Sequence, residues 1–264
     1  MKVMSFHYHL GIEFGSPVHD HSFTLRCIPQ SDERQQIKKL DFAVSPSNKL
    51  SESFDDFGNK CITGCTKVEH QKFEIDVCGV VKTGTKDSVA VADDYREHIY
   101  RYATDLTQAD DNIKTAAAGF KGKDELALAE EVMAFLKRHM VYTQNVTDIC
   151  TTAAESFAMG AGVCQDYAHI MLAMLRYRGV SARYVVGMIP GEGASHAWVE
   201  VRSGEAWYGF DPTNDTKVGD GYIKISHGRD YNDCVINRGF FYGDGRQRQV
   251  VSVKVTEMEQ EQNI

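Results

Sequence analysis

The amino-terminal part of the chain alternates between hydrophobic and polar positions, a period typical of half-buried strands. Four stretches carry the pattern, and turn-forming residues such as Pro29, Pro46 and Gly58 separate them. Their hydrophobic positions are Met4, Phe6, Tyr8, Leu10, Ile12 and Phe14; Phe23, Leu25 and Cys27; Leu40, Phe42 and Val44; and Phe73, Ile75 and Val77. Several short strands with such punctuation predict a β-sandwich or barrel, and we favour an antiparallel β-sandwich over residues 1–82.

Helical spacing replaces this alternation after a polar connection at residues 83–92. We interpret two stripes as the core-facing sides of amphipathic helices: Tyr95, Ile99, Tyr102 and Leu106, then Leu126, Ala129, Met133, Leu136 and Met140. Val251, Val253 and Val255 predict a last strand, followed by a polar tail from Glu257. The predicted fold class is α+β. Residues 83–264 form its second domain, in which helices pack on an antiparallel sheet.

Residues 162–172, GVCQDYAHIML, place a cysteine at the start of a predicted helix. Helical spacing continues through Ile170 and Met174, and Gly179 is placed to end the helix. Unpaired backbone N–H groups and the positive end of the helix dipole favour a thiolate in the first turn. Cys164 is therefore a candidate nucleophile. Taken alone, however, a free cysteine is more often an inert apolar residue.

The residues around Cys164 have simpler interpretations. Thr152 to Glu155 is a capping-box pattern, which predicts a short helix that ends at Gly160. We interpret Asp166 as a carboxylate that complements the helix dipole, not as a catalytic residue. His169 lies on a different helical face from Cys164, so we expect it to have a structural role.

A base and a carboxylate follow in two successive predicted strands. In SHAWVEV, residues 195–201, alternation places His196, Trp198 and Glu200 on one strand face. In AWYGFDPTN, residues 206–214, Asp211 lies at the end of a short aromatic strand, where it can accept a hydrogen bond from an imidazole. We predict a triad in which Cys164 is the nucleophile, His196 the general base and Asp211 the residue that orients the imidazole.

These motifs resemble those of the bacterial branch of the transglutaminase-like superfamily, whose members are papain-like cysteine enzymes. The resemblance rests on GVCQDYAH, SHAWVEV, FDPTN and the later GRDY at 228–231, in this order, over roughly residues 141–255. It implies that the family's catalytic triad is Cys164, His196 and Asp211, with no substitution. More loosely, the resemblance extends to an all-β domain at the amino-terminal end.

The composition agrees with a soluble enzyme, and the predicted partner is a peptide or protein substrate. Of the 264 residues, 42% are hydrophobic and 25% are charged, and the net charge is −8. This charge argues against nucleic acid as a partner, because phosphate binding needs clustered lysine and arginine. Neither a run of about 20 apolar residues nor a secretory signal is recognisable, so we expect a cytoplasmic protein without a membrane partner. We expect no cofactor, and the oligomeric state stays open.

The cysteines other than Cys164 predict no metal site. Seven cysteines without a signal peptide are typical of reduced thiols rather than of disulfides. Cys61 and Cys65 are four residues apart and the chain has no CxxC pair, a spacing that disfavours structural zinc. We expect Cys150 and Cys234 to pack as small apolar residues.

The predicted triad supports attack of the Cys164 thiolate on an amide carbonyl, with the Cys164 backbone N–H as one oxyanion donor. The second donor stays open among Gln165, Trp198 and Tyr142. Water would resolve the resulting thioester in a protease or amidase, and a second amine would resolve it in a transglutaminase. Because no second-substrate feature is recognisable, we favour hydrolysis of a peptide or isopeptide bond. Acyl transfer and a non-catalytic interaction module are the alternatives.

Overall fold

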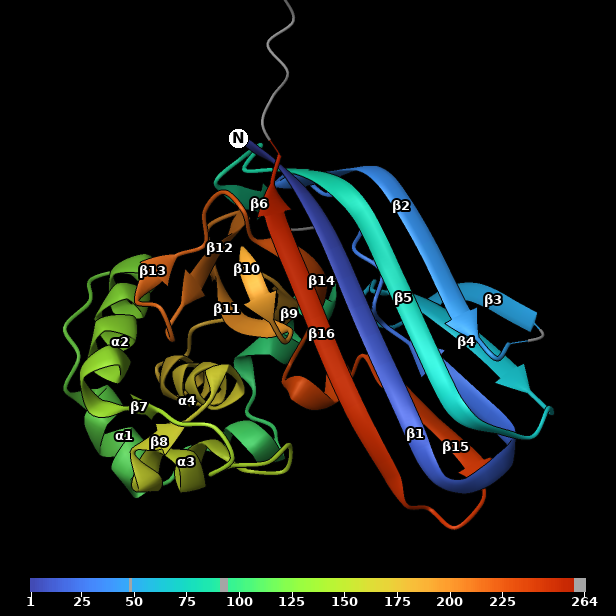
Figure 1. Cartoon of the computed structure of the whole chain (residues 1–264). Helices are drawn as coiled ribbons and strands as arrows, with labels where there is room; N and C mark the ends of the chain where they lie inside the picture. The colour runs from blue at the N-terminus through green and yellow to red at the C-terminus, as the bar shows by residue number, and fades with distance from the viewer. Residues whose placement is uncertain (48, 91–94, 259–264) are drawn as a thin grey trace, which may run out of the picture.

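Long antiparallel strands make up one half of the molecule, and helices on a second sheet make up the other (Figure 1). The computed structural model describes residues 1–47, 49–90 and 95–258. Its fold class is α+β, which confirms the prediction from the sequence. Among the described residues, no helix combines the length and apolar character needed to cross a membrane.

The first sheet is built around β1 (Lys2–Leu25), which shifts register between Glu13 and Val18 and so contributes to both ends of a curled sheet. Its apolar positions from Met4 to Phe14 are buried, as the alternation predicts. The other strands of this sheet are β2 (Gln35–Ser45), β3 (Lys49–Phe54), β4 (Lys60–Thr66), β5 (His70–Thr83), β10 (Gly191–Gly193), β15 (Asn237–Tyr242) and β16 (Gln247–Glu257).

Both ends of the chain contribute to this first sheet. β16 pairs with β1 from Met4 opposite Glu257 to Phe14 opposite Gln247, and β15 pairs with the far end of β1. Val253 and Val255 are buried in the same core as the apolar residues of β1. The predicted domain of residues 1–82 therefore shares its sheet with carboxy-terminal strands. The tail predicted from Glu257 lies outside the described residues after position 258.

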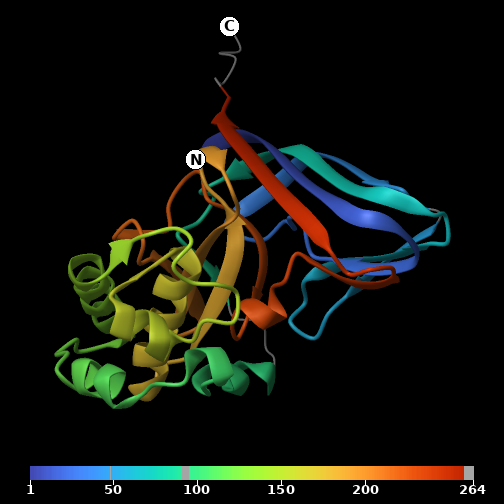
Figure 2. The same ribbon diagram turned by 60° about the horizontal axis from the view of Figure 1, so that its bottom comes forward.

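The second sheet carries the strands with the predicted base and carboxylate. These strands are β6 (Ser88–Ala90), β9 (Ala182–Met188), β11 (His196–Ser203), β12 (Ala206–Asp211), β13 (Thr216–Lys217) and β14 (Ile223–Gly228). Ala197, Val199 and Val201 of β11 pack in one core with α4 (Cys164–Tyr177), and the helices gather on that face (Figure 2). On the opposite face, Gln35 and Asn59 hydrogen-bond to the backbone of β14.

The helical layer matches part of the predicted pattern. α2 (Glu125–His139) buries Ala129, Met133 and Leu136, as predicted. The helix expected from Tyr95 to Leu106 is wrong, because the chain forms two short 3₁₀ helices there, η1 (Tyr95–Arg101) and η2 (Asp105–Thr107). Thr104 between them is extended and its hydroxyl bonds that of Thr107, which competes with a continuous helix.

Two further helices complete the layer. α1 (Asp111–Ala118) was not predicted, although Asp110 caps its first turn and three alanines end it. α3 (Ala153–Met159) begins with the predicted capping box of Thr152 and Glu155, and it ends at Gly160 in the left-handed conformation.

Candidate active site

Cys164 is the first residue of α4, at the end of a tight approach to that helix. After α3, Gly160 turns the chain into β8 (Ala161–Gly162), which pairs in parallel with β7 (Val141–Tyr142). Val163 then has an extended backbone as the N-cap residue, and Cys164 begins the helix. The thiol therefore lies where unpaired N–H groups and the helix dipole stabilise negative charge. This location agrees with the one predicted from the sequence.

Asp166 holds this first turn of α4 in place. Its Oδ2 atom accepts hydrogen bonds from the Val163 backbone N–H, at 2.7 Å, and from the Thr147 hydroxyl, at 2.7 Å. A Cβ atom on Gly162 would lie 2.5 Å from the same oxygen, so only glycine fits at that position. Asp166 therefore caps the helix and ties down the loop before α3. The sequence predicted only that Asp166 complements the helix dipole, and neither hydrogen bond was predicted.

His196 and Asp211 meet the thiol from two neighbouring strands. His196 begins β11 and Asp211 ends β12, and both side chains are buried. The Nε2 atom of His196 lies 2.7 Å from Oδ2 of Asp211. The imidazole also interacts with the Cys164 thiol through a side-chain hydrogen bond. The three residues predicted as a triad are thus in hydrogen-bond contact, in the order thiol, imidazole, carboxylate.

Asp211 is held by more partners than the sequence predicts. Its Oδ2 also accepts hydrogen bonds from the Tyr222 hydroxyl, at 2.8 Å, and from Nδ2 of Asn214, at 2.7 Å. Its Oδ1 accepts from the backbone N–H groups of Thr213 and Asn214. Asn214 lies in the FDPTN motif, which could have drawn attention to it. Nothing in the sequence around Tyr222 distinguishes it from an ordinary aromatic residue.

The electrostatics of the site follow from these contacts. Burial alone would lower the pKa of His196, but its hydrogen bonds with Asp211 and Cys164 outweigh burial and raise that pKa to about 9. Burial alone would raise the pKa of Asp211, yet the hydrogen bond from His196, together with those from Asn214 and Tyr222, lowers it. At neutral pH the imidazole is therefore held in its protonated form beside the ionised carboxylate.

The three side chains considered as second oxyanion donors lie in different surroundings. The Gln165 amide donates to the Ile149 carbonyl at 3.5 Å. Trp198 is buried beside the His196 ring, and its Nε1 has no partner among the described residues. Tyr142 pairs with Gly162, two residues before Cys164, across β7 and β8, and its side chain is half exposed.

Other residues singled out in the sequence have structural roles. His169 is buried, and its Nε2 accepts a hydrogen bond from the Tyr231 backbone. Burial lowers the pKa of His169 to about 3, so the ring is neutral. Arg229 of the GRDY segment pairs with Asp233 at 2.8 Å.

The remaining cysteines match the expectation only in part. Cys234 is buried, as expected, and burial raises its pKa far above the usual range. The expectation for Cys150 is wrong, because this side chain is exposed in the turn before α3. Cys61 is buried and Cys65 exposed, and among the described residues no group of three or more potential metal ligands is found.

Two family models match the chain. The model of the transglutaminase-like superfamily covers residues 114–212, and that of the bacterial transglutaminase-like N-terminal region covers residues 4–82. The chain belongs to the transglutaminase-like superfamily. Within the first match lie all three residues of the hydrogen-bonded thiol, imidazole and carboxylate chain.

Relatives of this transglutaminase-like protein occur in mycobacteria. An uncharacterised protein of Mycobacterium leprae is 26% identical over 273 residues, which cover 94% of this chain and 96% of that protein. An uncharacterised protein of Mycobacterium tuberculosis is 33% identical over 157 residues, or 53% of this chain and 50% of that protein.

A solved structure has the same fold over nearly the whole chain. It is the crystal structure of a Cytophaga hutchinsonii protein named "putative cysteine protease", with a TM-score of 0.79 and 20% sequence identity. The match covers 98% of this chain and 92% of that one. At this identity the likeness concerns the fold, in which a transglutaminase-like core follows an N-terminal β region.

Proposed function

We propose that this protein is a cysteine hydrolase that cleaves a peptide or isopeptide bond through Cys164, His196 and Asp211. The observation that carries the proposal is the continuous hydrogen-bonded chain from the helix-start thiol through the buried imidazole to the buried carboxylate. A nucleophile, a base and a residue that orients the base, all in mutual contact, are what acyl-enzyme chemistry requires.

In the proposed mechanism, the Cys164 thiolate attacks the amide carbonyl carbon, and the Cys164 backbone N–H donates to the oxyanion that forms. His196 gives its proton to the leaving nitrogen as the C–N bond breaks, which leaves a thioester. A water molecule then loses a proton to His196 and adds to the thioester carbonyl. When the C–S bond breaks, a carboxylic acid leaves and the thiolate–imidazolium pair returns. Asp211 keeps the imidazole oriented throughout.

Apolar side chains beside the nucleophile support a peptide substrate. Val146 and Ile149 are 44% and 59% exposed on the loop that precedes α3. The bonds from Thr147 to Asp166 and from Gln165 to the Ile149 carbonyl hold this loop against the first turn of α4. Exposed apolar residues next to a reactive thiol suit the side chains of a peptide better than a small hydrophilic amide.

The test is a library of peptides and isopeptides incubated with the native protein, with mass detection of released and amine-coupled products. The Cys164→Ala protein is the matched control. We expect hydrolytic products from the native protein, none from the variant, and hydrolysis still dominant with a primary amine present at millimolar concentration. Products that persist in the Cys164→Ala protein would refute the proposed nucleophile. Predominant amine-coupled product at low amine concentration would replace hydrolysis with acyl transfer.

A further inference from the structure

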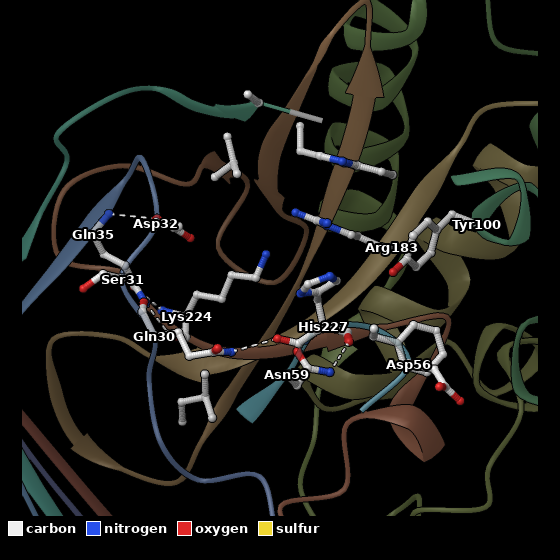
Figure 3. A pocket seen from close by; sticks show the side chains of 16 residues that line it. Gln30, Ser31, Asp32, Gln35, Asp56, Asn59, Tyr100, Arg183, Lys224 and His227 are labelled. Atoms are coloured by element: carbon white, nitrogen blue, oxygen red, sulfur yellow. Dashed lines mark hydrogen bonds between the residues drawn. The ribbon is translucent and has the colours of Figure 1, made fainter. Parts of the chain in front are cut away.

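A second cavity lies on the face of the catalytic sheet that α4 does not cover. Its volume is about 340 Å³, within the size range of small-molecule sites. Arg183 of β9, Trp207 of β12 and Lys224 of β14 form its floor, and segments 30–35 and 56–59 cover it from the amino-terminal half (Figure 3). Cys164, His196 and Asp211 do not line it. Glu200, behind its floor, lies four residues after His196 on β11, about 13 Å along the strand.

Two cations in this floor share one carboxylate oxygen. Arg183 Nε lies 2.6 Å and Lys224 Nζ lies 2.7 Å from the same Oε2 atom of Glu200. All three side chains are at least 85% buried. Burial opposes ionisation of Glu200, but Arg183 and Lys224 outweigh burial and lower its pKa to about 2. The cluster itself thus holds two cations against one carboxylate. Burial and Arg183 lower the pKa of Lys224, although Glu200 and Asp32 favour its charged form. An anion bound between Arg183 and Lys224 would favour that form further.

Donors directed at the cavity are left unused. Among the described residues, Nη1 of Arg183 has no hydrogen-bond partner, and Lys224 Nζ bonds only to Glu200. The Tyr100 hydroxyl and Nε1 of Trp207 likewise form no hydrogen bond to a described residue, although both rings line the cavity. Burial raises the pKa of Tyr100 to about 12, so its hydroxyl is protonated and can donate.

The other buried polar side chains of the wall differ, because the fold uses them fully. Asn59 accepts from the His227 backbone N–H and donates to the His227 carbonyl and to Asp55. Gln35 accepts from the Lys224 backbone N–H and donates to the Lys224 carbonyl. These hydrogen bonds fix the walls of the cavity to its floor, so the fold determines its shape. The donors that remain available to a ligand are concentrated at Arg183 and Lys224.

We infer that this cavity binds a small planar monocarboxylate. Its carboxylate would accept hydrogen bonds from Arg183 and Lys224, and its planar body would lie among Trp207, Tyr100 and Phe57. The guanidinium of Arg183 is already stacked 4.3 Å from the centre of the Trp207 ring, which holds it flat for such a contact. Asp32 and Asp56 on the covering segments repel a second negative charge, so a dicarboxylate is disfavoured. This site is separate from the proposed hydrolytic function.

The first experiment is calorimetric titration of the native protein with benzoate, its neutral isostere benzamide, and the dianion phthalate. We expect saturable binding of benzoate with a Kd on the order of 1 mM, and binding at least about tenfold weaker for the other two. Equal binding of benzoate and benzamide would overturn the inference, because Arg183 and Lys224 would then not recognise the carboxylate charge. Absence of saturable benzoate binding would overturn it as well.

The second experiment locates the bound molecule. The chain has two tryptophans, so a Trp198→Phe protein reports on Trp207 alone through its fluorescence. We expect benzoate to change this signal with the calorimetric Kd. Lys224→Met, which leaves a charge-neutral Arg183–Glu200 pair, should weaken binding at least about tenfold, and Lys224→Arg should preserve it. The matched control is Lys114→Met on the surface of α1. Unchanged binding in a folded Lys224→Met protein, or no change in the Trp207 signal, would refute the site.

Discussion

The Tyr222 hydroxyl donates a 2.8 Å hydrogen bond to the Asp211 carboxylate, to the same oxygen that holds His196. The carboxylate is buried, and its charge is balanced by donors from three directions rather than by the imidazole alone. Tyr222 therefore acts as a positioning residue for the imidazole, because it restricts the orientation of the group that orients His196.

Tyr222→Phe should lower both activity and stability. The variant removes one hydrogen bond to a buried charge, so we expect a loss of about 1–2 kcal/mol in the free energy of unfolding. We expect kcat on an accepted peptide to fall about tenfold, with KM little changed. Urea denaturation and steady-state kinetics measure the two effects. The control is Tyr208→Phe on β12, whose hydroxyl has no hydrogen-bond partner among the described residues. An equal loss of kcat in both variants would contradict the positioning role.

Asp211→Asn should preserve the fold and remove most of the activity. The amide cannot stabilise the imidazolium, so kcat should drop by a factor of order 10²–10⁴, if the behaviour of serine triads transfers. Circular dichroism checks the fold and peptide hydrolysis checks the rate. Asp215→Asn is the matched control, because Asp215 is exposed four residues further along the same turn. Near-native turnover in Asp211→Asn would show that another group orients the base.

Alkaline pH should weaken both stability and acylation through His196. Its pKa in the folded protein is about 9, above the ordinary value of 6.5. The stabilisation it contributes is therefore complete below about pH 6.5 and is lost as the pH rises through about 9. Acylation should decline over the same upper range, because the leaving nitrogen needs the imidazolium proton. The measurement is the urea midpoint against pH for the native protein and for His196→Gln. Parallel curves for the two proteins would rule out this linkage.

Cys164 should react with iodoacetamide before the other cysteines at about pH 6. The helix start and the protonated His196 both favour its thiolate, whereas Cys65 and Cys150 are exposed without such partners. Mass spectrometry of peptides after brief labelling gives the order of reaction. In His196→Gln the preference for Cys164 should largely disappear. Faster labelling of Cys65 or Cys150 in the native protein would mean that exposure, not charge, controls reactivity.

The proximity of Cys164, His196 and Asp211 could be predicted from sequence because each residue lies at the boundary of an element. Cys164 begins a helix, His196 begins a strand and Asp211 ends one, and local patterns fix such boundaries. Tyr222 and the Thr147–Asp166 bond could not be predicted, since they depend on where separate loops meet in space. The same limit applies to the first sheet, whose strands alternate clearly but whose pairing partners come from opposite ends of the chain.

Local patterns were misleading where side chains compete with the backbone. The stripe from Ile99 to Leu106 has helical spacing, yet the hydroxyls of Thr104 and Thr107 bond each other and divide the segment.

The cavity lined by Arg183 and Lys224 could not be predicted from any local sequence pattern. Its cations come from different strands, and only the register of β9, β11 and β14 brings both to Glu200.

The pairing of β1 with β16 also determines when the protein can fold. About 220 residues separate the two strands, and Phe6 and Tyr8 have no complete core until Val253 and Val255 arrive. At ordinary rates of synthesis, this interval lasts on the order of 10–45 s. Throughout that time β1 presents a long apolar edge to other chains, a state prone to aggregation. Production in cells should therefore benefit from slow expression at low temperature and from chaperones that bind extended apolar segments.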